Sequence, residues 1–472
     1  MKLVAARRAC LGLLFALLLP AVGQAADGTN RFPAQLLAFS AAKAEQAHQL
    51  AAALNLQVSP DIWTFFKCAT NGDLAGVTNT FTRLKWRASQ YDGSANDPAV
   101  STSVWQTLIE VVTAYQAFGE GGLKYPLAFG QDIINSIPPG SIYFGGTDPG
   151  RGLVTALCKS QIHADPFFTL TQNALADDRY LTYLRLMYGR QIYISTTNDT
   201  RTAFTDYTSD ARLRFEHDRD FPGEPRQVRP GEGINQTADG QIQVSGQVSV
   251  MAINALIVKN IFDHNPDREF YIEESFPLDW MYPYLSPHGL IFKLNRQPLP
   301  QLTPEMINAD HAFWSKQCDP MLGPWLTSDM PLSNVCQFVV SVYVQKDYSH
   351  FTGDRDFVTD LYATKMYSKL RSSSGGLYQW RLANKTYVGD TNRLAAETDF
   401  AFRQSFALCP TSPEAIYRYI NFLMSQNRVN DAILLVRTAR RVDPDNESLS
   451  GVLTQLLNAR EQQRRATQAT GG

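Results

Sequence analysis

Short apolar segments alternate with helix-forming segments between residues 126 and 300, and this alternation constrains the fold more than any other feature of the chain. Strand-like composition recurs at 141–144, 166–171 and 191–195, and helical patterns at 153–158 and 177–188 lie between these segments. Strands joined by helices are typical of an α/β layer with a parallel sheet. We therefore predict a central α/β domain with a mainly parallel sheet over 126–300.

A segment of different composition interrupts this domain at 209–247. Residues 210–220 are rich in charge, and the following stretch PGEPRQVRPGEG is expected to be a mobile loop. Two short polar strands then flank Ala238-Asp239-Gly240, which predicts a β-hairpin. An apolar helix at 248–262 and strands at 269–273 and 290–294 are expected to complete the domain.

Helices are predicted on both sides of the α/β domain. In the N-terminal helical region, 26–125, Trp63, Phe66 and Ala69 follow each other at helical spacing, and Asn71-Gly72 breaks the pattern. Residues 301–360 show no clear periodicity and are predicted to be an irregular connecting region. Residues 361–464 return to helical patterns, and the tail 465–472 is expected to be disordered.

A 34-residue unit at 413–446 matches the pattern of a tetratricopeptide repeat (TPR). The apolar residues Ile416, Tyr419 and Ile420 lie at the packing positions of its first helix. Small residues, Ala432 and Ala439, lie where the second helix would approach closely, and Pro444 ends the unit. The window 379–412 repeats part of this pattern. We predict TPR-like helical repeats over 361–464.

Such repeats bind proteins or peptides on a concave face. The residues predicted to contact a partner are Tyr417, Asn421 and Met424. The alternative is that these helices only cap the α/β domain or mediate dimerisation.

The first 25 residues have the pattern of a secretory signal peptide. Lys2, Arg7 and Arg8 precede the short apolar run LGLLFALLL, and small residues precede an expected cut before Ala26. The run is shorter than the ~20 residues that a membrane span needs. The alternative is an uncleaved N-terminal anchor. We expect a periplasmic or secreted protein after cleavage, without a transmembrane segment in the mature chain.

Composition and cysteine spacing exclude several classes of protein. Hydrophobic residues make up 44% and charged residues 19%, which excludes a disordered chain. A formal net charge of −2 gives no electrostatic basis for nucleic-acid binding. The cysteines after the leader are scattered, without the spacing of a zinc site. Cys318 and Cys336 are either a disulfide pair or buried single thiols.

The loop that follows the first strand is the best candidate for a ligand site. Ligands bind at the carboxyl ends of parallel strands, glycines let backbone N–H groups approach them, and the next helix N-terminus favours an anion. Polar residues after two other strands are candidates for the same cleft. The candidate ligand-binding residues are Gly145, Gly146, Thr147, Asp148, Arg151, Asn173, Glu273 and Glu274. The structural alternative is that Asp148 caps the helix before Pro149 and that Arg151 pairs locally.

No catalytic residue, cofactor or metal site is predicted. Two carboxylates, Asp148 and Glu273, are of the kind that general acid–base catalysis uses, but the sequence does not give their separation. Common catalytic motifs such as GxSxG, HExxH and GxxxxGK[ST] are missing. The aromatic run FPLDWMYPY at 276–284 is suited either to stacking on sugar rings or to wedging between strands.

Three segments resemble a known group of proteins: SIPPGSIYFGGTDPGR, FFTLTQNALADDRYLTYLR and FYIEESFPLDWMYPYLSPHGLIFKLN. In this order, and followed by a repeat, they resemble uncharacterised exported bacterial TPR proteins. They are more distantly similar to the soluble C-terminal region of protein O-mannosyltransferase-like (GT-C) membrane proteins. The resemblance implies an accessory role at the cell envelope. It does not imply glycosyl transfer, because this chain lacks the membrane unit expected to carry that activity.

These observations predict an exported cell-envelope scaffold that binds a protein or peptide partner through TPR-like helices and has no catalysis of its own. The alternative is a carbohydrate-binding or glycan-processing accessory module that uses the α/β cleft.

Overall fold

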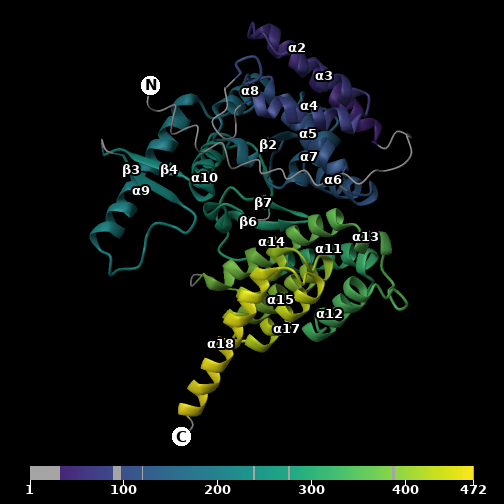
Figure 1. Cartoon of the computed structure of the whole chain (residues 1–472), viewed down its shortest axis with the longest axis vertical. Coiled ribbons are helices and arrows are strands. Elements are labelled where there is room, and N and C mark those ends of the chain that lie inside the picture. Colours follow the sequence, from purple (N-terminus) through teal and green to yellow (C-terminus); the bar gives the residue numbers. More distant parts are fainter. Residues whose placement is uncertain are drawn as a thin grey trace. The chain divides into compact units, whose positions relative to one another are not determined.

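The structure is a computed structural model that describes residues 32–88, 97–119, 121–237, 240–274, 277–384 and 389–470. The predicted signal peptide lies outside these residues. The chain divides into two compact units. Unit 1 consists of 1–119, 137–271 and 278–280, and unit 2 of 120–136, 272–277 and 281–472. Most of the described chain is helical, and its main sheet is small (Figure 1).

The N-terminal region of unit 1 is helical, as predicted. Its helices are α2 (Ala34–Ala53), α3 (Pro60–Thr70), α4 (Leu74–Arg87) and α5 (Trp105–Gly119). The predicted break at Asn71-Gly72 is confirmed: Gly72 has a φ of 73°, and Asp73 caps α4 by accepting a hydrogen bond from Gly76 N at 2.9 Å. The apolar stripe of α3 is buried, with Phe65 and Ala69 both inaccessible.

Two of the predicted strands pair in parallel. Strand β1 (Ile142–Gly145) aligns with β2 (Phe168–Thr171), so that Gly145 lies opposite Thr171. Helix α7 (Asp148–Leu157) connects them, and α8 (Asp178–Tyr188) follows β2 after the short turn η1 (Gln172–Ala174). This is the strand–helix–strand unit that the alternation predicts.

The third predicted strand, 191–195, is wrong. The structure has no strand there, and the side chain of Asn265 binds the backbone at the middle of this segment. Tyr193 N donates to Asn265 Oδ1 at 2.8 Å, and Asn265 Nδ2 donates to Tyr193 O at 3.0 Å. A side chain that takes up both backbone groups leaves neither available for a strand ladder.

The charged interruption forms a long helix and a hairpin. Helix α9 (Thr197–Asp220) includes the charge-rich segment, and the predicted hairpin is present as β3 (Gly233–Gln236) and β4 (Ile242–Ser245). Its turn residues Ala238 and Asp239 lie outside the described residues. The loop between α9 and β3, predicted to be mobile, is hydrogen-bonded to α9: Asp218 accepts from Gln227 N at 2.7 Å and Val228 N at 3.0 Å. Helix α10 (Gln247–Asp263) follows, as predicted.

The main sheet is mixed, which corrects the prediction of a mainly parallel one. Its order is β2-β1-β5-β7-β6, with β5 (Phe270–Glu273), β6 (Leu285–His288) and β7 (Ile291–Leu294). Strands β6 and β7 pair antiparallel. The sequence did not indicate β6 because it contains Pro287, but an edge strand tolerates proline since its outer N–H groups need no partner.

The segment 301–360 is helical, so the prediction of irregular structure is wrong. It contains α11 (Pro304–Leu322), α12 (Leu332–Val339), the single-turn element η3 (Val340–Gln345) and α13 (Arg355–Thr359). Thr303 caps α11, Pro304 occupies its first turn, and Ile307, Trp314 and Cys318 are buried at helical spacing. Polar residues between these positions hide the periodicity in the sequence.

Unit 2 also contains α6 (Lys124–Ser136), the turn η2 (Asp279–Tyr284, of which Asp279 and Trp280 belong to unit 1), and a series of C-terminal helices (Figure 1). This series is α14 (Leu361–Ala383), α15 (Thr391–Leu408), α16 (Pro413–Ser425), α17 (Val429–Val442) and α18 (Glu447–Thr470). Each helix packs on the next one in the chain. The predicted helices are therefore present, and their assignment to TPR units stays a prediction. The helix α18 continues into the tail that we expected to be disordered.

Candidate functional site

The loop between β1 and α7 is shaped by its glycines and by Thr147. A Cβ atom on Gly145 would lie 3.0 Å from Cα of Arg151, so a larger residue would push the strand and the helix apart. Thr147 Oγ1 accepts a hydrogen bond from Gly150 N at 3.2 Å and caps α7, and Pro149 occupies the first turn. The helix cap is therefore Thr147 and not Asp148, which the structural alternative had assigned to it.

Asp148 and Arg151 form an ion pair in the first turn of α7. The distance from Arg151 Nη2 to Asp148 Oδ1 is 2.5 Å. The Arg151 side chain is 10% exposed, whereas that of Asp148 is 65% exposed. Local pairing of Arg151 agrees with the structural alternative, and it contributes only about 0.2–1 kcal/mol with so exposed a partner. The carboxylate of Asp148 still faces solvent.

Asn173 reaches the same loop from the end of β2. Its Nδ2 donates to Gly146 O at 3.0 Å. Helix α10 holds this arrangement, because Asn254 Oδ1 accepts from Ala176 N at 2.8 Å and Asn254 Nδ2 donates to Asn173 O at 3.4 Å. The prediction that the second strand end lies beside the first loop is confirmed. The role of these residues in ligand binding stays a prediction.

Glu273 and Glu274 are buried at the end of β5, with 0% and 6% exposure. Both belong to unit 2, whereas the loop at 145–151 and Asn173 belong to unit 1. Glu274 O accepts a hydrogen bond from Ser373 Oγ of α14 at 2.9 Å. A single cleft that contains both carboxylates and the loop therefore stays a prediction.

The aromatic run at 277–284 is engaged with its own surroundings. Trp280 Nε1 donates to Ala255 O of α10 at 3.1 Å, and its ring lies 5.5 Å from that of Phe262. In unit 2, Tyr282 stacks on Trp380 with ring centroids 5.4 Å apart. Of the two alternatives for this run, these contacts favour rings packed within the fold over rings that are open to stack on a sugar.

The three predicted partner-binding residues lie on one face of α16. Tyr417, Asn421 and Met424 follow each other at intervals of four and three residues, so helical geometry places them side by side. Asn421 is exposed, and Tyr417 and Met424 are partly exposed. The opposite side of the helix is buried, with Tyr419 at 0% and Ile416 at 3% exposure. The structure thus brings all three residues together at solvent.

A pocket of 270 Å³ in unit 2 was not predicted from the sequence. It lies where η3, α13, the start of α14, the α15–α16 loop and the end of α17 meet. Its lining residues are Tyr343, Lys346, Val358, Thr359, Leu361, Thr364, Cys409, Pro410, Thr411 and Val442. They come from five separate segments, and no motif in the sequence connects them.

Lys346 is the charged residue of this pocket, and its backbone is unusual. Its φ of 57° is left-handed, a conformation that costs free energy for a residue other than glycine and is found preferentially at functional sites. Its side chain is exposed. In the sequence, Lys346 is marked only by its position directly after the mostly apolar segment VVSVYVQ. This pattern is too common to identify a candidate site residue.

Hydroxyl groups in the pocket already donate to backbone carbonyls. Tyr343 Oη donates to Leu408 O at 2.9 Å, Thr359 Oγ1 to Arg355 O at 3.0 Å and Thr364 Oγ1 to Leu361 O at 3.0 Å. Burial, reinforced by Cys409, raises the pKa of Tyr343 well above its usual value, so that phenol is neutral. These oxygens consequently offer lone pairs rather than protons to anything in the pocket.

A buried ion pair in unit 1, Lys43 with Glu110, was also missed. Lys43 Nζ donates to Tyr183 Oη at 2.6 Å and to Gln46 Oε1 at 3.0 Å, and Tyr183 Oη donates to Glu110 Oε2 at 2.8 Å. Desolvation lowers the pKa of Lys43, and Glu110 opposes this shift. Because the lysine is inaccessible and fully hydrogen-bonded, the pair serves to hold α2, α5 and α8 together.

The described cysteines are all free: Cys68, Cys158, Cys318, Cys336 and Cys409. Of the two readings for Cys318 and Cys336, the structure therefore has buried single thiols. Among residues that the structure describes, no group of His, Cys, Asp and Glu side chains could hold a metal ion. In the same ranges, no helix has the length and apolar character to cross a membrane.

Comparison with known proteins found no match to this chain. No protein-family model, no curated protein and no solved structure matches the chain.

Proposed function

We propose that this chain is an exported cell-envelope protein that binds a protein or peptide partner through its C-terminal helices and has no catalysis of its own. One observation carries the proposal: Tyr417, Asn421 and Met424 lie side by side at the solvent face of α16, within a series of helices that each pack on the next. A rigid series of this kind presents a continuous binding surface.

The chemistry of this face suits a polypeptide partner. Tyrosine provides a large contact area with a polar end, and methionine adapts to irregular apolar surfaces. Asparagine supplies both a donor and an acceptor for a backbone amide. A partner segment with an apolar residue flanked by free amides would satisfy all three side chains.

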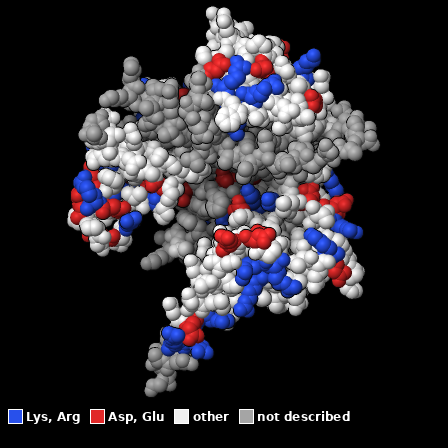
Figure 2. Space-filling view, viewed as in Figure 1, with Lys and Arg blue, Asp and Glu red and all other residues white. Residues whose placement is uncertain are grey.

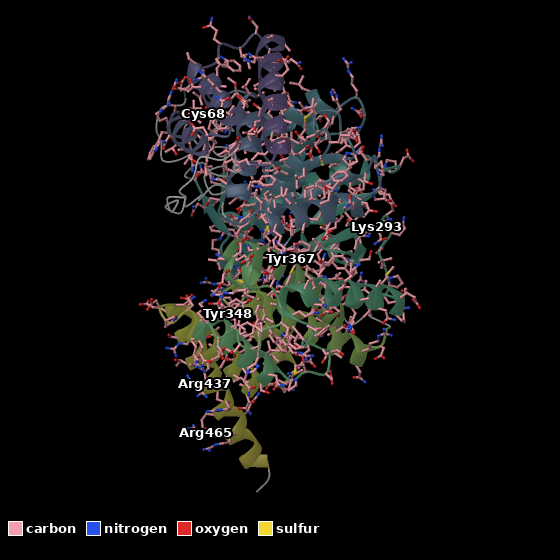
Figure 3. All side chains as sticks on the ribbon, turned by 90° about the vertical axis from the view of Figure 1, so that its right-hand side faces the viewer. Cys68, Lys293, Tyr348, Tyr367, Arg437 and Arg465 are labelled. Carbon is pink, nitrogen blue, oxygen red and sulfur yellow. The ribbon has the colours of Figure 1, made fainter. Side chains whose placement is uncertain are left out.

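Cationic side chains lie on the neighbouring helices and favour an acidic partner. Figure 2 shows Lys and Arg side chains gathered over the C-terminal helices. Arg437 and Arg441 of α17 are exposed, and Arg465 is exposed near the end of α18; Figure 3 labels Arg437 and Arg465. Arginines of this kind raise the rate of association with an acidic segment, and salt weakens their effect.

A photo-crosslinking experiment tests the proposal. A photoreactive phenylalanine analogue is placed at Tyr417, Asn421 or Met424, one position at a time, in the full chain expressed in its own host. We expect all three positions to give the same crosslinked protein. Matched positions at exposed Thr202 and Thr205 of α9, in unit 1, are the controls and should not give it. The absence of a shared product at the three α16 positions would refute the proposal.

Export and the TPR assignment are parts of the same proposal. The signal-like leader supports export, and N-terminal sequencing of the mature protein tests it, with Ala26 as the expected first residue. The helix pair α16–α17, with Ala432 and Ala439 both fully buried, supports the TPR assignment.

The alternative proposal, carbohydrate binding at the β1–α7 loop, has one observation in its favour. The exposed carboxylate of Asp148 lies in the loop that Asn173 also reaches, so a hydroxyl-rich ligand would find an acceptor there. Titration with a small set of soluble glycans tests it. Saturable binding that is lost in Asp148→Ala and kept in Asp178→Ala, an aspartate in the first turn of α8, would favour this alternative.

A further inference from the structure

The pocket between η3, α13, α14 and the end of α17 combines one cation with acceptors and an apolar wall. Lys346 contributes the charge, and the pocket lining contains no carboxylate. The side chains of Val358, Leu361, Pro410 and Val442 contribute the apolar surface. This combination is independent of the α16 face and makes no use of it.

The charge selects an anionic ligand. Lys346 is exposed, and no ion pair involves it in the part of the chain that the structure describes, so its ammonium group can bind an acid. A ligand ammonium would meet a like charge here, and the residues that line the pocket offer it no carboxylate. The ligand therefore carries a negative group and no positive one.

The hydroxyls select a ligand that also donates hydrogen bonds. Tyr343, Thr359 and Thr364 give their own protons to backbone carbonyls of Leu408, Arg355 and Leu361. A ligand that only accepts hydrogen bonds would leave these oxygens without a partner after it displaces water, which costs affinity. A ligand hydroxyl satisfies one of them.

The size and the apolar wall select a short aliphatic chain. The volume of 270 Å³ lies just below the ~300–1,000 Å³ that is usual for pockets of drug-sized ligands. Leu361 is 55% exposed although it lines the pocket, so a bound aliphatic group would cover apolar surface that now faces water.

We propose that this pocket binds a small hydroxycarboxylate with a short aliphatic chain. Its carboxylate pairs with the Lys346 ammonium, its hydroxyl donates to a threonine oxygen of the wall, and its chain lies against Leu361 and Val442.

Calorimetric titration of the mature full-length protein tests the proposal, with 2-hydroxy-4-methylpentanoate as the probe. Two comparison ligands each lack one feature: 4-methylpentanoate has no hydroxyl, and the methyl ester of the probe has no charge. We expect saturable binding of the probe at millimolar concentration or below. Each comparison ligand should bind about five- to tenfold more weakly, as expected for one lost hydrogen bond or one partly solvated ion pair.

Variants assign the interaction to the pocket. Lys346→Gln should weaken binding of the probe about fivefold. It should leave binding of the ester unchanged, because the ester has no charge that pairs with Lys346. Lys316→Gln, at an exposed lysine of α11, is the control and should change neither ligand. Val442→Phe should abolish binding of all three ligands by filling the pocket. Since Lys346 is exposed, Lys346→Gln should fold even if Val442→Phe does not.

Four outcomes would overturn the proposal: no saturable binding of the probe, equal binding of the acid and its ester by the unmodified protein, equal binding of the probe and 4-methylpentanoate, or equal weakening of probe binding by Lys346→Gln and Lys316→Gln. A loss confined to Lys346→Gln, together with weaker binding of both comparison ligands, would establish it.

Discussion

Arg371 of α14 and Asp310 of α11 form an ion pair inside unit 2 from which water is excluded. Arg371 Nη1 lies 2.6 Å from Asp310 Oδ2, and the two side chains are 0% and 1% exposed. Tyr378 Oη donates to the same carboxylate oxygen at 2.6 Å, and Gln404 Oε1 accepts from Arg371 Nε at 2.7 Å. The contacts of Asp310, Arg371 and Gln404 join α11, α14 and α15, although Asp310 Oδ1, Arg371 Nη2 and Gln404 Nε2 are buried without a hydrogen-bond partner among the described residues.

Removing one partner of this pair should destabilise unit 2 strongly. Asp310→Ala leaves the Arg371 charge buried without its counter-ion, and we expect a loss of about 3–5 kcal/mol in the free energy of unfolding. The double variant Asp310→Leu/Arg371→Met removes both charges and should lose less than Asp310→Ala. Urea unfolding measures the free energy of unfolding of the single and the double variant. A double variant that is less stable than the single one would show that the pair itself, and not the avoidance of a lone charge, provides the stability.

Asp354 should make unit 2 sensitive to acid. Partial burial opposes its ionisation, but hydrogen bonds from Lys124 and Tyr125 outweigh this and lower its pKa to about 2. Because the folded-state pKa lies below the unfolded value of about 3.9, the stabilisation is complete above pH 4 and is lost as the pH falls from about 4 to 2. Asp354→Asn should therefore cost about 2 kcal/mol at pH 7 and little at pH 2.

The measurement is the urea midpoint of each protein between pH 2 and pH 7. The control is Asp319→Asn, at an exposed aspartate of α11, which should behave as the unmodified protein does. If Asp354→Asn costs the same at both ends of this range, the hydrogen bonds to Asp354 do not depend on its charge.

Neighbouring glycines of α14 should respond oppositely to alanine. A Cβ on Gly375 would lie 2.8 Å from the ring of Phe402 on α15, whereas one on Gly376 would have its nearest neighbour, Arg418, at 3.5 Å. Gly375→Ala should lower the melting temperature, because the two helices must separate. Gly376→Ala should raise the free energy of unfolding by about 0.5–1 kcal/mol through helix propensity. Equal effects of the two substitutions would show that α14 and α15 are not in contact at Gly375.

Cys68 should be the most reactive thiol of the native protein. Burial raises the pKa of Cys318 to about 12 and that of Cys336 to about 11, and Cys158 and Cys409 are also buried. Cys68 is partly exposed, although burial and Asp73 raise its pKa too. Alkylation of the native protein near pH 8 should therefore modify Cys68 slowly and the other cysteines hardly at all. Alkylation after denaturation should then modify all of them, and an intact mass that lacks two labels would indicate a disulfide.

The sequence was sufficient to predict the structure where interactions between adjacent residues determine it. The break at Asn71-Gly72, the hairpin at 233–245 and the helix start at Pro413 depend on backbone preferences of a few adjacent residues. Hydrophobic periodicity indicated the buried face of α16 for the same reason. The side-by-side position of Tyr417, Asn421 and Met424 follows from that periodicity.

Contacts between residues far apart in the sequence decided the features that local patterns did not predict. Asn265 takes up the backbone of Tyr193 in the segment predicted to be a strand, although the two residues are 72 positions apart. Edge position, which depends on pairing with β7, lets a proline-containing segment become β6. The candidate loop residues were identified, but only the tertiary structure shows that Arg151 is engaged with Asp148 and that Thr147 is the helix cap.

By itself the sequence determined where most helices form, that β1 and β2 pair through a helical connection, and which face of α16 is solvent-facing, because these features follow from residues close together in the chain. The tertiary structure alone decided that the sheet is mixed, that Asp310 and Arg371 meet in the interior, and that five segments enclose a pocket beside Lys346. Contacts of this second kind join residues far apart in sequence. Their free energy depends on the packing of whole elements, which no local pattern encodes.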